Sequence, residues 1–213
     1  MRDLIDYFAK HSDMLMSAFL EHLQIVFITL IISIVLAAVI SYLLLKSEKA
    51  TNVTVNIFSQ IYSIPSLALF ALLIPLLGLG NKTAIPVLVL YNQYLLIRNI
   101  MTGMQQVDKS LLEAGTGMGM NKWQLVTKVQ VPLAMPSILA GIRLAIISTT
   151  GIATIAATIN AGGLGKILLS GLRTMNTYKI AWGTILSVII ALVADMVLKL
   201  LEKKTKATKL NEI

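Results

Sequence analysis

The feature that most constrains this chain is an apolar run of 23 residues, Leu23–Leu45, that contains no charged side chain. As a helix rising 1.5 Å per residue it would be about 34 Å long, enough to cross a hydrocarbon core of about 30 Å. A cleavable signal peptide would have a shorter apolar region behind a basic tip, whereas a mixed-charge segment, residues 1–21, comes first here. We therefore expect a retained membrane span, preceded by an amphipathic helix over residues 1–21 that lies at the membrane interface.

The whole chain has the composition of a protein embedded in lipid. Hydrophobic residues make up 56% and charged residues 13% of its 213 residues, whereas soluble domains carry about 25% charged residues. We predict an all-α integral membrane domain over residues 22–201, with five spans at about residues 23–45, 53–79, 83–97, 136–159 and 180–200. Pro65 and Pro75 interrupt the second span, where we expect kinks.

The distribution of Lys and Arg predicts the orientation. With the N-terminus outside, 12 basic residues lie in the inner segments and 6 in the outer ones. The positive-inside rule therefore favours an outer N-terminus, a cytoplasmic C-terminus and a basic cytoplasmic tail over residues 202–213. This topology explains the net charge of +8 better than nucleic-acid binding does, because aromatic residues are only 6%. We expect the lipid bilayer, and no nucleic acid, as a partner.

The residues needed for catalysis or cofactor binding are missing. The chain has no cysteine, and His11 and His22 form no metal-ligand pair with carboxylates. The pair Gly165-Lys166 lacks the upstream glycine and the following Ser or Thr of a phosphate-binding loop. No span contains a nucleophile with a matching base. We therefore expect no enzyme activity, no metal and no cofactor in this chain.

Residues 100–135 form a cytoplasmic interval that is too rich in helix formers to be a linker. Ser110 and Glu113 have the spacing of a capping box, and Gly119 is placed to end that helix. A second helix is expected over Asn121–Gln130, stopped by Pro132. Such a helical hairpin is a suitable surface for docking to another protein.

The pattern in this hairpin is Glu113-Ala114-Gly115, three residues, Gly119, nine residues, then Val129-x-Val131-Pro132. It resembles the EAA loop (Glu-Ala-Ala, x3, Gly, x9, Ile-x-Leu-Pro) of type I ABC importer permeases, with small changes. The resemblance implies the fold of these permeases and a coupling loop over residues 108–132 that fits a groove on a separate ATPase, which binds ATP and Mg. The implied coupling residues are Glu113, Ala114, Gly115, Gly119, Trp123 and Pro132.

The segments Ser63–Leu69 and Ala161–Gly165 extend the resemblance. They are similar to the branch of permeases that import glycine betaine, carnitine, choline or proline betaine. This branch implies a multi-pass protein of the bacterial cytoplasmic membrane that pairs with a second copy or a paralogue and receives substrate from an extracytoplasmic binding protein. An amino-acid permease of the methionine type remains an alternative. A passive channel or secondary transporter is the alternative from another class, although no membrane-buried acid with a partner suits proton coupling.

A transport path is expected among the polar residues of the spans. Thr150, Thr154 and Thr158 recur every four residues, so they either line a path or pack against a neighbouring helix. A quaternary ammonium substrate requires aromatic faces, because it has no N–H donor. The candidates are Tyr62, Tyr91 and Tyr94, with Asn92 beside them, although tyrosines also anchor spans at membrane interfaces.

Three further features lie near the ends of the predicted spans. The glycines Gly162, Gly163 and Gly165 follow the fourth span and suggest a flexible turn that acts as an external gate or docking surface. We interpret Arg143 as snorkelling to the inner headgroups, and Asp195 as an ion-pair partner of Lys199 four residues on.

Overall fold

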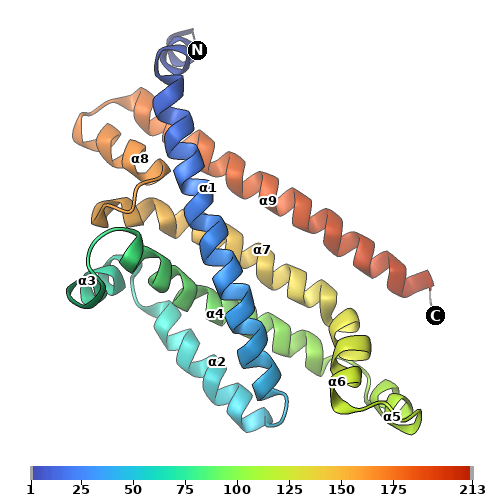
Figure 1. The fold of residues 1–213 in the computed structure, drawn as a ribbon. Coiled ribbons are helices and arrows are strands. Elements are labelled where there is room, and N and C mark those ends of the chain that lie inside the picture. Colours follow the sequence, from blue (N-terminus) through green and yellow to red (C-terminus); the bar gives the residue numbers. More distant parts are fainter. Residues whose placement is uncertain (1, 212–213) are drawn as a thin grey trace.

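The computed structural model describes the backbone of residues 2–211 and the side chains of residues 3–203. Over this range the fold is built from helices and turns, without strands. The long helices α1 (Arg2–Leu44), α4 (Asn81–Gln105), α7 (Val131–Ile155) and α9 (Thr177–Asn211) form the body of the molecule (Figure 1). Four helical segments of the described residues are long and apolar enough to cross a membrane, and a bent pair supplies a fifth. The predicted all-helical membrane class is confirmed.

The second predicted span is broken rather than kinked. It consists of α2 (Glu48–Ser63) and α3 (Ser66–Leu77), whose axes differ by 96°. The break falls at Ile64, which has the extended backbone (φ −68°, ψ 133°) that is favoured before a proline. The hydroxyl of Tyr91 donates a 2.7 Å hydrogen bond to the Ile64 carbonyl, which satisfies a backbone group that the break leaves free. Pro75 lies inside α3 without ending it.

At both ends of the chain the observed helices extend beyond the boundaries that we predicted for the membrane domain. Residues 12–21 continue the first span, because the only non-helical backbone inside α1 is at His11. Leu15 and Ala18 are buried in a cluster with residues of α8 (Leu164–Arg173) and α9, so the predicted boundary at residue 21 is wrong. Only residues 2–10 lie beyond the bend, and their place at the interface stays a prediction. The backbone of the predicted tail continues α9 to Asn211, while its side chains from residue 204 on lie outside the described residues.

The third and fourth spans are longer than predicted. Arg98 does not end the third span, since α4 continues to Gln105. Likewise Pro132 does not stop a helix: α6 (Lys122–Leu125), the π-helical turn η1 (Val126–Gln130), α7 and the 3-10 turn η2 (Ala156–Ile159) follow one another without a break. Pro132 has no amide hydrogen and its ring would clash with the Lys128 carbonyl in a regular α-helix, so the wider π turn accommodates it.

Helices α4 and α7 approach each other closely through glycine. A Cβ atom on Gly141 would lie 2.7 Å from Cβ of Asn99, and one on Gly103 would lie 2.7 Å from Cβ of Ser137. Small residues are the usual means of close helix contact in membranes, where no hydrophobic effect drives helices together. This α4–α7 contact forms the centre on which α1, α2 and α9 pack.

Candidate functional site

The predicted coupling residues lie on a hairpin of α5 (Lys109–Gly117) and α6 at one end of the bundle, with α3 and α8 at the opposite end (Figure 1). Asp108 caps α5 by accepting a 2.9 Å hydrogen bond from the Ser110 amide, so the predicted Ser110–Glu113 capping box is wrong. Hydrogen bonds from the backbone and side chain of Ser110 lower the pKa of Asp108. A capping box does occur at the start of α6, where Asn121 and Gln124 each accept from the other's amide at 2.9 Å.

Two glycines shape the hairpin. Gly119 has φ +81°, the left-handed conformation that favours glycine, and it directs the chain from α5 into α6. Gly115 lies where α5 contacts α6, since a Cβ there would be 2.6 Å from Cδ2 of Leu125. Glu113 and Ala114 are exposed on the outer side of α5. The hairpin therefore exposes Glu113 and Ala114, the first two residues of the motif, on its surface.

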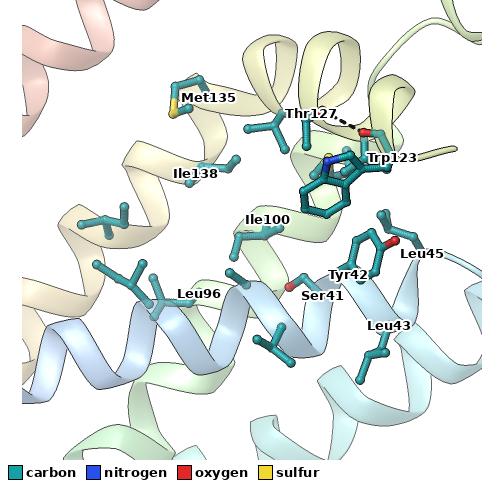
Figure 2. A pocket seen from close by; sticks show the side chains of 17 residues that line it. Ser41, Tyr42, Leu43, Leu45, Leu96, Ile100, Trp123, Thr127, Met135 and Ile138 are labelled. Carbon is teal, nitrogen blue, oxygen red and sulfur yellow. Dashed lines mark hydrogen bonds between the residues drawn. The ribbon is translucent and has the colours of Figure 1, made fainter. Parts of the chain in front are cut away.

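Trp123 and Pro132 lie apart from that exposed surface. The indole of Trp123 packs edge-on against Tyr42 of α1, with ring centroids 5.5 Å apart, although 59% of the residue is exposed. Behind it lies an apolar pocket of about 470 Å³ between α1, α4 and the start of α7 (Figure 2). Pro132 belongs to the first turn of α7. Trp123, at the start of α6, thus brings the hairpin into direct contact with the first span, a connection that the sequence alone did not predict.

The three candidate tyrosines come together although they belong to two helices. The ring of Tyr62 on α2 lies 5.6 Å from that of Tyr91 and 5.3 Å from that of Tyr94, both on α4. Its hydroxyl also lies 3.4 Å from the Ser148 hydroxyl on α7. The Tyr94 hydroxyl accepts a 2.6 Å hydrogen bond from Arg98. We call Tyr62, Tyr91 and Tyr94 the tyrosine cluster; Ser148 and Arg98 beside it were not predicted.

Asn92 belongs to a different set of contacts, between α1, α4 and α7. Its amide nitrogen donates to the Thr149 hydroxyl of α7 at 2.9 Å and to the Ser33 hydroxyl of α1 at 3.2 Å, and the Thr149 hydroxyl donates back to its carbonyl oxygen at 3.0 Å. All three side chains are buried. This polar network joins three spans, and Asn92 is therefore separate from the tyrosine cluster. The sequence signal was weak, because Ser33 is one small polar residue in a long apolar run.

The threonines of the fourth span have different surroundings. Thr150 is buried and its carbonyl accepts from His22 Nε2 at 3.2 Å, whereas Thr158 is exposed in the 3-10 turn η2. Each hydroxyl donates to a carbonyl three or four residues earlier in the chain, at 2.7 or 2.8 Å. A line of three threonines along one path stays a prediction. The contact of α7 with His22, a residue to which we assigned no chemistry, is new.

The glycine turn after the fourth span is closely packed. Gly162 and Gly163 have φ +84° and +67°, and the Gly163 amide donates a 2.9 Å hydrogen bond to the carboxylate of Glu21 on α1. A Cβ on Gly165 would lie 2.0 Å from the Thr154 carbonyl oxygen. Gly162 and Gly163 are thus favoured by their backbone conformation, and Gly165 by the lack of space for a side chain. Their proposed role as a gate stays a prediction.

Three charged residues inside α7 and α9 form an ion-pair group. Lys199 lies 2.6 Å from the Asp195 carboxylate, as predicted. Arg143 also pairs with Asp195, at 3.6 Å, instead of snorkelling alone. This ion-pair group connects α7 with α9, which pack against each other.

Comparison with known proteins identifies the family. The protein-family model described as the binding-protein-dependent transport system inner membrane component matches residues 29–207. The chain belongs to this family. This permease is 35% identical over 212 residues to the carnitine transport permease protein OpuCB of Listeria monocytogenes, covering 100% of this chain and 97% of that protein. It is 38% identical over 184 residues to the glycine betaine/carnitine/choline transport system permease protein OpuCB of Bacillus subtilis (strain 168), covering 86% and 85% of the two chains.

A solved structure has the same fold. The permease resembles a chain of the MetNI methionine ABC transporter in an inward facing conformation with a TM-score of 0.82 at 21% identity, covering 90% of this chain and 95% of that chain. The predicted fold of type I importer permeases is therefore confirmed.

Proposed function

We propose that this permease is the membrane subunit of an ATP-driven importer of quaternary ammonium osmoprotectants, the class of glycine betaine, carnitine and choline. The observation that carries the proposal is the tyrosine cluster, in which rings from α2 and α4 lie 5.3 and 5.6 Å apart inside the spans. A methylated ammonium has no N–H donor and is attracted to aromatic faces, by about 0.5 to 2 kcal/mol for each favourable ring. The substrates named for the two OpuCB relatives belong to this class.

The exposed face of α2 supports a path beside the cluster. Asn52, Asn56, Gln60 and Ser63 recur every three or four residues and are exposed. Residues at this spacing lie on one helix face, and such a polar face is unfavourable against lipid tails. We infer that it borders an aqueous path, enclosed by this chain and a second copy or a paralogue.

The hairpin supports coupling to a separate ATPase that binds ATP and Mg. It presents Glu113 with two exposed apolar residues, Leu111 at 47% and Met118 at 72% exposure, and exposed apolar groups outside the spans indicate a protein contact. In the proposed orientation the hairpin is cytoplasmic, because that side carries most Lys and Arg. The Trp123–Tyr42 contact then connects ATPase movement to α1. The extracytoplasmic binding protein docks at the opposite end, near the glycine turn.

Uptake into proteoliposomes tests the proposal. The permease is reconstituted with its ATPase, binding protein and any paralogous permease, and labelled glycine betaine, carnitine, choline and methionine are supplied with and without ATP. We expect ATP-dependent uptake of the quaternary ammonium compounds. Uptake of methionine alone would overturn the substrate class, and ATP-independent flux through the isolated chain would overturn the importer.

Matched variants test the hairpin in the same assay. Glu113→Ala should remove ATP-dependent uptake while the protein stays in the membrane, because the hairpin can no longer engage the ATPase. Glu48→Ala is the control, since Glu48 is an exposed carboxylate at the start of α2, outside the hairpin. Normal uptake by Glu113→Ala would show that this surface does not couple.

A further inference from the structure

Beside the tyrosine cluster lies Arg98, which has no acidic partner among the side chains that the structure describes. Its Nη1 donates a 2.6 Å hydrogen bond to the Tyr94 hydroxyl, and its Cζ lies 5.7 Å from the centroid of that ring. Among residues 3–203, the ion pairs to carboxylates involve Arg143 and Lys199, not Arg98. A guanidinium has five N–H donors, so most of those on Arg98 remain available.

The position of Arg98 in α4 indicates an open, polar environment. It lies about two turns before the end of a 25-residue helix that is otherwise largely buried. Tyr94, Arg98 and Thr102 follow one another at four-residue spacing, and the last two are exposed. Charged residues inside membrane spans usually face a cavity or a path and indicate where a substrate passes.

A contact inside the protein holds the side chain of Arg98. An arginine that reaches for the nearer headgroups would extend toward the C-terminal end of α4. The guanidinium instead donates a hydrogen bond to the hydroxyl of Tyr94, a residue one helical turn earlier in the chain. It is therefore held at the edge of the tyrosine cluster.

We propose that Arg98 binds the carboxylate of zwitterionic substrates while the tyrosine cluster holds their trimethylammonium group. This inference rests on the proposed function. Glycine betaine and carnitine carry both groups, whereas choline carries only the cation. The planar guanidinium matches a carboxylate with two parallel hydrogen bonds, and a fixed positive charge disfavours a substrate that has only a cation. Arg98 is thus a specificity-determining residue that favours betaines over choline.

The test is the ratio of glycine betaine uptake to choline uptake in proteoliposomes that hold the complete complex with saturating binding protein. The variants are Arg98→Gln, which removes the charge, Arg98→Lys, which keeps it without the planar fork, and Arg173→Gln as a control. Arg173 is exposed at the end of α8, far along the chain from the cluster. Because the ratio is internal to each preparation, differences in expression cancel, and division by the wild-type ratio removes the preference of the binding protein.

We expect Arg98→Gln to lower the ratio by about tenfold or more, the loss of one charge-assisted hydrogen-bonded contact. Arg98→Lys should lower it less, and Arg173→Gln should leave it unchanged. If Arg98→Gln does not assemble, the ratio for Arg98→Lys decides. A ratio within twofold of wild type, with ATP-dependent uptake of both substrates intact, would overturn the role of Arg98 and leave the proposed function standing. Absence of ATP-dependent uptake in the wild-type complex would overturn the proposed function itself, and the role of Arg98 with it.

Discussion

Gly165→Ala should destabilise the contact between α8 and α7. A Cβ atom at this position would lie 2.0 Å from the Thr154 carbonyl oxygen, 2.7 Å from its carbonyl carbon and 2.8 Å from its Cα. All three are backbone atoms, so no side-chain rotation relieves the clash, and α8 must move away from α7. The displaced helix also carries Leu164 and Ile167, which are buried in a cluster with α1.

The magnitude follows from two opposing effects. Overpacking a close contact costs about 1 to 3 kcal/mol, while alanine in place of glycine inside a helix contributes up to about 1 kcal/mol. We expect a net loss of about 1 to 2 kcal/mol, and therefore a Tm lower by several degrees. Gly117→Ala is the matched control, because no atom lies within 4 Å of a Cβ at this helical position, and its Tm should be equal or slightly higher.

Thermal unfolding of both purified variants in one detergent, followed by circular dichroism, measures the difference. Glycine-betaine uptake by the reconstituted complex then reports whether the displaced turn also affects transport. If Gly165→Ala unfolds at the wild-type temperature, the close approach of α8 to Thr154 is refuted, and with it the argument that this glycine is required by space.

Three further predictions concern other contacts. In a double-mutant cycle, Asn92→Ala and Thr149→Val should couple by about 0.6 to 1.7 kcal/mol, the range for hydrogen bonds between membrane helices, whereas additive changes in Tm would contradict the network. Because the pKa of Asp108 is lowered in the folded protein, its cap should be fully effective above the usual Asp pKa and be lost as the pH falls through the lowered value. The protection of the α5 amides against hydrogen exchange, measured relative to their intrinsic rate at each pH, should therefore fall in acid for the wild type but not for Asp108→Asn. Arg143→Gln should cost about 1 kcal/mol or less, since its pair with Asp195 is partly exposed; a loss above about 3 kcal/mol would mean a desolvated pair.

Several elements of the fold and site follow from local chemistry. Uncharged runs such as Leu23–Leu45 predict spans because lipid offers no hydrogen-bond partner to the backbone, which must therefore form helices. The turn at Gly119 was predictable from the conformational freedom of glycine, and the structure gives it φ +81°. The pairing of Asp195 with Lys199 follows from four-residue spacing on a helix.

The misjudged elements depend on contacts between residues far apart in the chain. A 96° break, not a kink, occurs at Pro65, and the Tyr91 hydroxyl from another helix satisfies the carbonyl that the break leaves free. Pro132 did not end a helix because a π turn absorbs it. Arg143 has a partner on α9, 52 positions along the sequence, that periodicity does not reveal.

The sequence by itself determined that this protein is a helical membrane permease, because hydropathy acts through local backbone requirements and the motif from Glu113 to Pro132 is typical of the family. Only the tertiary structure decided which polar side chains meet. Tyr62, Tyr91 and Tyr94 form one cluster with Arg98 at its edge, while Asn92 turns away to Ser33 and Thr149. Residues 91 to 94 are neighbours in sequence, but consecutive helix positions point in different directions, so packing against α1, α2 and α7 assigns each side chain its partner.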